Sequence, residues 1–130
     1  MEKARVFISF DFDNDKFLKE ALVGQAKNED SPFEIADWSL QEAAPEEDWE
    51  EDAKEKIKRS DILCVIAGKK TYKTPGVLKE IAIADELISD GYDIKKFQLI
   101  GHKDEECPHV DGAGRRIAWT WENLKNYFKI

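Results

Sequence analysis

The sequence predicts an α/β domain, a three-layer sandwich in which an open, mostly parallel sheet of four to five strands has helices on both faces. Short β-branched and aromatic runs alternate with longer amphipathic stretches along the chain. The run 61–67 is apolar almost throughout, as expected for the middle of a parallel sheet that is covered on both sides. No internal repeat or linker divides the 130 residues, so we expect one domain over 1–130.

The first expected strand covers residues 5–10 and is followed by a polar segment rich in aspartate. Asn14 or Asp15 can cap the next helix, which we expect to end near 27–28. The spacing of its apolar residues predicts one inward face made of Phe17, Leu18, Ala21, Leu22 and Gln25.

A short second strand over 33–36 is expected to deliver Asp37, Trp38 and Ser39 to its carboxyl end. A loop over 40–45 follows, and Pro45 begins an acidic helix. The inward face of this helix is predicted to contain Trp49, Ala53 and Ile57.

The third strand is expected over 61–67 and ends at Gly68. Thr74 and Pro75 suit the cap and first position of a helix that Gly91 closes. The buried stripe of that helix is predicted to contain Val77, Ile81, Ala84 and Ile88.

A fourth strand is expected over 96–101, followed by a polar loop that ends at Gly114. Residues 116–119 suit a fifth strand at the edge of the sheet. The last helix, over 120–128, is predicted to place four apolar residues on one side: Trp121, Leu124, Tyr127 and Phe128.

Composition restricts the partners and the location of the protein. With 28 acidic and 20 basic residues, the net charge of −8 disfavours binding to nucleic acid or to an anionic membrane surface. The apolar runs are too short to span a bilayer, and residues 1–5 lead into a strand instead of a signal-peptide segment. We therefore expect a cytoplasmic protein with Cys64 and Cys107 as free thiols.

The loop after the first strand does not match the known phosphate-binding motifs. Neither G-x-G-x-x-G nor G-K-[ST] occurs, and the aspartates at 11, 13 and 15 would repel a phosphate group. Asp11 and Asp13 leave open two less favoured alternatives, a Mg²⁺-dependent aspartyl-phosphate phosphatase and a receiver-like domain. The first needs a hydroxyl residue and the second an acceptor aspartate at the end of a later strand, where this chain has Ala67 and Gly68.

Two histidines and a cysteine share the loop before Gly114. His102, Cys107 and His109 could in principle bind a transition metal, but no fourth ligand with a recognised spacing accompanies them. We therefore expect a solvated loop and no metal site. Among the tryptophans, Trp38 beside the predicted site is the candidate for stacking on a ligand base.

Glu80 is the main candidate for chemistry. It lies about 60° from Val77 around the helix, on the flank of the apolar stripe, so it partly faces the sheet. Its helix begins at the carboxyl edge of the sheet, which also receives Ser9 and Phe10 after the first strand and residues 37–39 after the second. A solvated glutamate that is stabilised by the helix dipole is the equally weighted alternative.

Several segments in this order resemble the prokaryotic TIR-like domains, with the closest likeness to the small stand-alone branch that includes the TIR-like proteins of Thoeris antiphage defence. The segments are Ile8-Ser9-Phe10, Asp37-Trp38-Ser39, the strand from Ser60 to Ile66 with Gly68, Thr74 to Ile81, and Trp119 to Leu124.

The resemblance implies a flavodoxin-like TIR fold and cleavage of the nicotinamide N-glycosidic bond of NAD⁺, which is a substrate and not a cofactor. It also implies that Glu80 contacts the nicotinamide ribose, that Ser9 and Phe10 line the pocket, and that residues 37–39 enter a loop that takes part in self-association. The ADP-ribosyl product, linear or cyclic, would then signal to an effector protein. Phosphate recognition would depend on backbone N–H groups and on Lys69, Lys70 or Lys73.

Gly76 occupies a position where many relatives carry tryptophan, and the loop after the second strand lacks the Arg-Asp-x-x-Pro-Gly pattern of animal TIR domains. A non-catalytic TIR-like module that binds another protein therefore remains an alternative from a different functional class.

Overall fold

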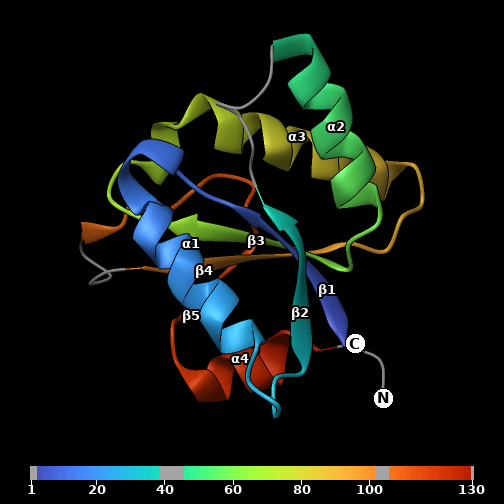
Figure 1. Ribbon diagram of the computed structural model, residues 1–130. Coiled ribbons are helices and arrows are strands. Elements are labelled where there is room, and N and C mark those ends of the chain that lie inside the picture. The colour runs from blue at the N-terminus through green and yellow to red at the C-terminus, as the bar shows by residue number, and fades with distance from the viewer. Residues whose placement is uncertain (1–2, 39–45, 102–105, 130) are drawn as a thin grey trace.

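The computed structural model describes residues 3–38, 46–101 and 106–129, and it confirms the predicted α/β fold. Within these residues, five strands form one parallel sheet in the order β2-β1-β3-β4-β5 (Figure 1). In chain order the elements are β1 (Ala4–Ser9), α1 (Phe12–Ala26), β2 (Phe33–Trp38), α2 (Glu46–Lys58), β3 (Ile62–Ala67), the 3₁₀ helix η1 (Thr71–Lys73), α3 (Pro75–Ser89), β4 (Lys95–Ile100), β5 (Arg115–Ala118) and α4 (Trp121–Tyr127).

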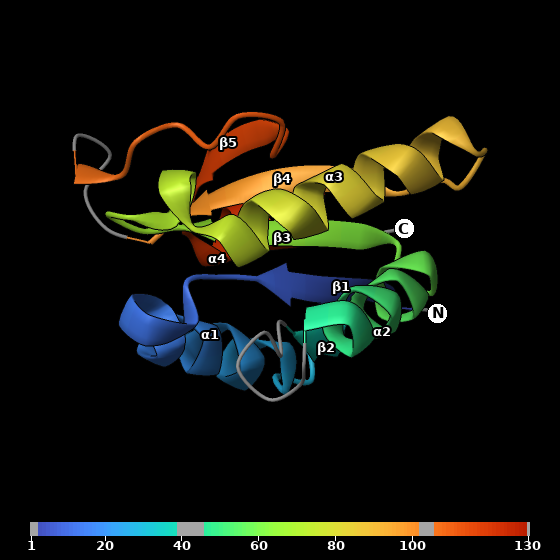
Figure 2. The ribbon, with the colours of Figure 1, turned by 90° about the horizontal axis from the view of Figure 1, so that it is seen from above.

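Helices cover both faces of the sheet, as the three-layer prediction requires (Figures 1 and 2). On one face, Leu22 of α1 and Leu124 of α4 share a core with Ile8 of β1. On the other face, Ile57 of α2 and residues of α3 share a second core with Phe7. Successive side chains of a strand point to opposite faces, so β1 contributes to both cores.

The centre of the sheet is β3, which is buried along its whole length. Its side chains alternate between the two cores: Ile62, Cys64 and Ile66 in the first, and Leu63, Val65 and Ala67 in the second. This arrangement explains the continuous apolar run, because a parallel strand covered on both faces presents no side chain to water. Cys64 and Cys107 are both free, as predicted.

The start of α1 differs from the prediction. The N-cap is Asp11, not Asn14 or Asp15, and its side chain accepts a hydrogen bond from the backbone N–H of Asp13 at 3.2 Å. The helix therefore begins earlier than expected. The backbone at Asp15 departs from helical geometry, with φ −119° and ψ 18°, and the Asp15 side chain is buried.

The buried face of α1 was also partly mispredicted. Leu18, Leu22 and Ala26 are buried, whereas Phe17 and Ala21 are exposed. The buried side chains are four residues apart, and this spacing leaves Phe17 and Ala21 one position away from the stripe that faces the sheet. As a result, a phenylalanine with 58% of its surface exposed lies at the start of α1.

The helix α3 begins at Pro75 after Thr74, as predicted, and Gly91 follows its end with φ 104°. Its buried apolar residues are Val77, Ile81, Ala84 and Leu87. Ile88, which was predicted to be buried in place of Leu87, is exposed. The stripe advances by three residues after Ala84 because a helix has 3.6 residues per turn, so a buried stripe alternates between steps of three and four.

The other helices follow the predicted patterns. In α2, Trp49, Ala53 and Ile57 are buried, while the predicted start at Pro45 and the loop 40–45 lie outside the described residues. The fifth strand, β5, lies at the edge of the sheet beside β4. In α4, Leu124 and Phe128 are buried, and Trp121 and Tyr127 pack against the same core.

Candidate active site

The carboxyl ends of β1 and β3 define the point at which the chain connections diverge. In the strand order 2-1-3-4-5, β1 connects to β2 on one side, while β3 connects to β4 on the other. Ligands of open α/β sheets bind outside the strand ends at this type of switch point. Ser9, the last residue of β1, pairs with Val65, two residues before the end of β3.

Glu80 is the charged member of the buried face of α3. Its exposed fraction is 0%, so it is more deeply buried than the partly desolvated position that the sequence predicted. Removing a carboxylate from water is costly unless hydrogen bonds replace the lost hydration. Hydrogen bonds from neighbouring groups must therefore compensate the cost of removing the Glu80 carboxylate from water.

Ser9 provides one such hydrogen bond. Its hydroxyl donates to Oε1 of Glu80 at 2.6 Å, and both residues are fully buried. Contacts of this length are typical of charge-assisted O–H···O⁻ hydrogen bonds. The bond connects the end of β1 to the second turn of α3 and fixes the orientation of the carboxylate.

The other candidate site residues are distributed around this pair. Phe10 is fully buried in the core that β1 shares with α1 and α4, whereas Ser9 faces α3. The backbone of Asp37 and Trp38 lies beside β1, paired with Phe7 and Ile8, at the same edge of the sheet as Ser9. Ser39 lies outside the described residues.

A second polar cluster, which the sequence did not predict, joins α1 to the end of β3. The Oδ2 atom of Asp15 lies 3.2 Å from the hydroxyl of Thr71. That hydroxyl accepts a hydrogen bond from the backbone N–H of Gly68 at 2.8 Å, and it also lies 3.0 Å from the carbonyl oxygen of Ile66. A Cβ atom at Gly68 would overlap the Asp15 carboxylate, so any larger residue there would displace this side chain.

The acidic segment after β1 is mostly directed into the protein. Asp11 accepts hydrogen bonds from the N–H of Asp13 and from the side-chain amide of Asn14, the latter at 2.6 Å. Asp11 and Asp15 are buried, and Asp13 is exposed. The capping role of Asp11 disfavours the phosphatase alternative, which needs this carboxylate as an accessible nucleophile.

A cavity of about 240 Å³ opens at this edge. It is lined by Asn14, Asp15 and Phe17 of α1 and by Lys69 and Lys70 from the segment after β3. Figures 1 and 2 both place the start of α1 and the segment after β3 at the same end of the molecule. The cavity is thus located at the switch point between β1 and β3.

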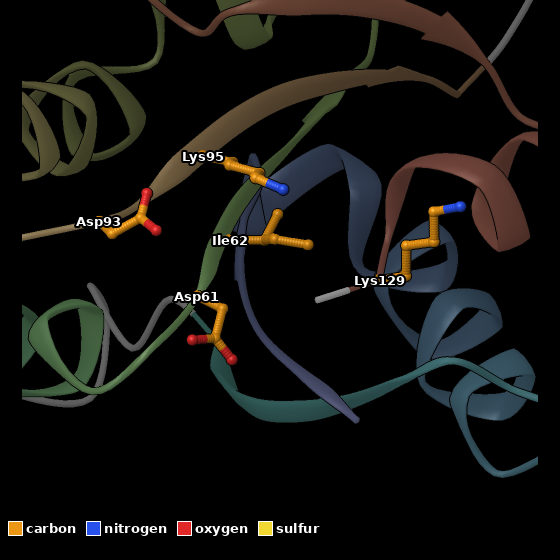
Figure 3. A pocket seen from close by; sticks show the side chains of 5 residues that line it. All are labelled: Asp61, Ile62, Asp93, Lys95 and Lys129. Atoms are coloured by element: carbon orange, nitrogen blue, oxygen red, sulfur yellow. The ribbon is translucent and has the colours of Figure 1, made fainter. Parts of the chain in front are cut away.

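A smaller cavity of about 120 Å³ lies at the opposite, amino edge of the sheet (Figure 3). Its walls come from the starts of β3 and β4 and from the C-terminal segment, with Asp61, Ile62, Asp93, Lys95 and Lys129 as lining residues. The backbone N–H of Arg5 donates to Asp61 at 2.9 Å, so this carboxylate already has a structural role.

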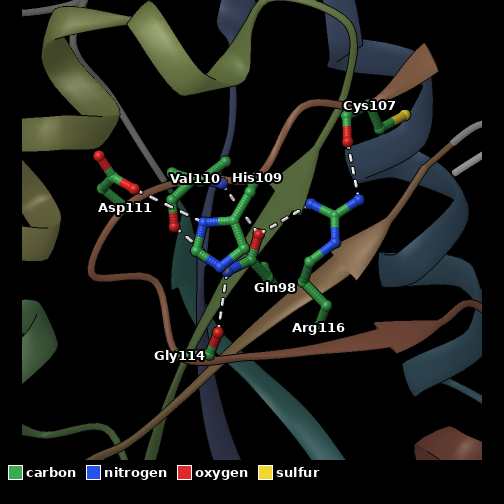
Figure 4. A network of polar contacts seen from close by, with 7 residues as sticks. All are labelled: Gln98, Cys107, His109, Val110, Asp111, Gly114 and Arg116. Carbon is green, nitrogen blue, oxygen red and sulfur yellow. Dashed lines mark hydrogen bonds and ion pairs between the residues drawn. The ribbon is translucent and has the colours of Figure 1, made fainter. Parts of the chain in front are cut away.

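The loop that carries His109 and Cys107 is anchored to the sheet by Gln98 of β4 (Figure 4). The Gln98 amide nitrogen donates to the carbonyl oxygens of Val110 and Gly114 at 3.2 and 2.8 Å, and its oxygen accepts from the Val110 N–H at 3.0 Å. Arg116 donates to the same oxygen at 3.1 Å. These hydrogen bonds fix the loop on the sheet, and most of its described residues are exposed, as the sequence predicted.

The metal-binding alternative for this loop has little structural support. Cys107 is buried, whereas His109 is exposed, and the two side chains point in different directions (Figure 4). His102 lies outside the described residues. Among the residues that the structure describes, no group of three histidine, cysteine, aspartate or glutamate side chains is arranged to hold a metal ion.

The parallel sheet in the order 2-1-3-4-5, covered by helices on both faces, defines a flavodoxin-like α/β domain, with a helix glutamate against the end of β1. The chain belongs to the family described as Thoeris protein ThsB, TIR-like domain, whose sequence model matches residues 7–104. The match includes Ser9, the segment 37–39 and Glu80. No curated protein matches the chain. In the described ranges, no helix is long and apolar enough to cross a bilayer.

Proposed function

We propose that this domain cleaves the N-glycosidic bond between nicotinamide and ribose in NAD⁺, with Glu80 as the catalytic carboxylate. The observation that carries the proposal is the desolvated Glu80 carboxylate, held by Ser9 at the carboxyl edge of a TIR-like sheet. Membership of the Thoeris family supports a role in antiphage defence. The ADP-ribosyl product would act as a signal for an effector protein.

The chemistry suits a single carboxylate. As the bond breaks, its electron pair leaves with nicotinamide, which becomes neutral, and the ribose acquires oxocarbenium character. A carboxylate beside this ribose stabilises the developing positive charge, and it does so more strongly in a dry site than in water. Water then captures the ribosyl cation and loses a proton to give a linear product, or an adenine nitrogen captures it to give a cyclic one.

Ser9 acts in this proposal as a positioning residue. Its hydroxyl holds Oε1 of Glu80 at 2.6 Å, and this contact leaves the carboxylate with one orientation towards the strand ends. Orientation matters because electrostatic stabilisation depends on the placement of the charge before the reaction begins.

Neither Glu80 nor Ser9 is exposed in the conformation described here. Substrate can reach the carboxylate only after a rearrangement at this edge of the sheet. We therefore place the described conformation in an inactive, closed state, from which an activating signal or self-association would release the domain.

The complete burial of Glu80 also favours a second candidate, a non-catalytic TIR-like module. In that case the Ser9–Glu80 hydrogen bond would serve only to attach α3 to β1, and exposed surfaces would bind another protein. The two candidates make opposite predictions for Glu80→Gln, because glutamine keeps the size of the side chain and the hydrogen bond from Ser9 but removes the charge.

Mass spectrometry of NAD⁺ products decides between them. Concentrated protein, with and without a phage-derived activator, should release nicotinamide, and Glu80→Gln should abolish release without lowering the unfolding midpoint by more than a few degrees. Glu86→Gln is the matched control, because Glu86 is an exposed residue of the same helix that pairs with Lys54 at 3.3 Å. Absence of release under every activating condition would favour the interaction module, whereas equal release by wild type and Glu80→Gln would refute the catalytic role of Glu80.

A further inference from the structure

We infer that the cavity between α1 and the segment after β3 binds the adenosine diphosphate half of the dinucleotide. Lys69 and Lys70 would contact the diphosphate, and Phe17 would stack on adenine. This inference rests on the proposed function, which identifies the substrate as NAD⁺. It adds the place where the adenosine diphosphate half, remote from the cleaved bond, is bound.

The position of the cavity is the first argument. Its lining residues follow β1 and β3, the two strands at which the connections diverge, and nucleotides bind to open α/β sheets outside these strand ends. Ser9 ends β1, so the contact with Glu80 and this cavity share the same edge of the sheet.

Charge is the second argument. In a chain with net charge −8, Lys69 and Lys70 are exposed and adjacent, and within the described part of the chain neither forms an ion pair. Some other lysines do form ion pairs, such as Lys54 with Glu86 at 3.3 Å and Lys79 with Glu50 at 2.7 Å. Two uncompensated ammonium groups at one cavity suit the two negative charges of a diphosphate.

The neighbouring aspartates do not cancel this charge at the cavity surface. Asp11 is buried as the N-cap of α1, and its oxygens accept from Asp13 and Asn14. Asp15 lines the cavity but is only 2% exposed, and its Oδ2 atom faces the hydroxyl of Thr71. Of the three aspartates in this segment only Asp13 is exposed, so an anionic ligand meets less repulsion than the sequence suggests.

The exposed aromatic ring is the third argument. Phe17 lines the cavity with 58% of its surface exposed, although its position in the sequence pattern predicted burial. Stacking on a base removes such a ring from water and tolerates any nucleobase, because every base has a flat π face. A cavity with paired ammonium groups and an exposed ring matches a nucleotide better than a simple anion.

Binding of ADP, measured by calorimetry or by NMR titration, tests the inference without any turnover. Wild type and Glu80→Gln should bind ADP equally, because ADP lacks the bond that Glu80 is proposed to cleave. Lys69→Glu/Lys70→Glu should weaken binding of both ADP and inorganic pyrophosphate at least tenfold. Phe17→Ala should weaken ADP binding severalfold and leave pyrophosphate binding unchanged.

The matched control is Lys27→Glu/Lys95→Glu, which makes the same change in net charge at exposed positions and includes a lysine of the amino-edge cavity. The control should bind ADP like wild type. The inference is overturned if wild type fails to bind ADP, or if the control loses as much affinity as Lys69→Glu/Lys70→Glu. If the double substitution proves unstable, the single variants Lys69→Met and Lys70→Met replace it. ADP binding without release of nicotinamide would refute the proposed reaction and retain this site.

Discussion

Ser9 and Glu80 form a buried hydrogen bond of 2.6 Å between the end of β1 and the second turn of α3, across 71 residues of sequence. Neither side chain reaches solvent. The contact joins the first strand to the helix that follows the third strand, so it can form only when the sheet is assembled. This contact and the packing elsewhere in the fold can be tested by substitution.

Removing the Ser9 hydroxyl should destabilise the fold. Ser9→Ala leaves the buried Glu80 carboxylate without one donor, and hydrogen bonds to charged groups contribute about 1.5–3 kcal/mol. We expect a decrease of about 2 kcal/mol in the free energy of unfolding in urea. Ser89→Ala, at an exposed position at the end of α3, should change it by less than about 0.5 kcal/mol. Equal effects of the two substitutions would show that the buried hydrogen bond is energetically unimportant.

Gly68 and Gly24 should respond in opposite directions to alanine. A Cβ atom at Gly68 overlaps the Asp15 carboxylate, so Gly68→Ala should lower the free energy of unfolding by about 1–3 kcal/mol. A Cβ atom at Gly24 meets nothing within 4 Å, and alanine is the better helix former there. Gly24→Ala should therefore raise stability by about 0.5–1 kcal/mol. Thermal unfolding of both variants measures the difference, and a stable Gly68→Ala protein would contradict the placement of Asp15.

Cys64 should make the stability of the protein decrease in alkaline solution. Burial raises the pKa of the Cys64 thiol, whereas an unfolded cysteine titrates at about 8.5. Above that pH the unfolded chain loses a proton that the folded chain keeps, so stability is fully present below the unfolded pKa and is lost as pH rises. The slope contributed by one such group is at most about 1.4 kcal/mol per pH unit.

The comparison is between wild type and Cys64→Ala over pH 8 to 10, with the free energy of unfolding measured in urea at each pH. The variant will be less stable at neutral pH because it leaves a small cavity, but its stability should fall less steeply with pH. Parallel pH profiles would mean that the thiol ionises equally in both states.

Gln98 should control the order of the loop that precedes β5. Gln98→Leu removes the partners of the Val110 N–H, the Gly114 carbonyl and one Arg116 nitrogen together. Because buried polar groups without partners are costly, we expect a loss of about 2–4 kcal/mol in stability. Hydrogen exchange at the Val110 amide should accelerate more than exchange at amides of β1. Unchanged protection of Val110 would argue that the loop does not depend on this side chain.

Much of the fold could be predicted from the sequence because its signals are local. The alternation of apolar runs and amphipathic stretches predicted the order of the strands and helices, and Thr74 with Pro75 marked the start of α3. Errors occurred where the choice depended on packing. Phe17 is apolar and close to the right spacing, yet it lies one position away from the stripe of Leu18, Leu22 and Ala26 that faces the sheet, and it is exposed.

The candidate site was only partly predictable for the same reason. Helical spacing placed Glu80 on the flank of the stripe, but it could not show complete burial or the donor on β1. Asp15 was predicted only as a possible cap, and the only sequence signal of its real position was the glycine at 68, directly after the central strand.

The sequence by itself determined which segments are strands or helices and which residue types face the sheet, because backbone hydrogen bonding and side-chain periodicity act over a few residues. Only the tertiary structure decided that Ser9 meets Glu80 and that the Asp15 carboxylate lies over Gly68. It also brought Phe17 and the adjacent lysines Lys69 and Lys70 to one cavity. These contacts depend on how the helices settle on the sheet, and no local pattern in the sequence encodes that packing.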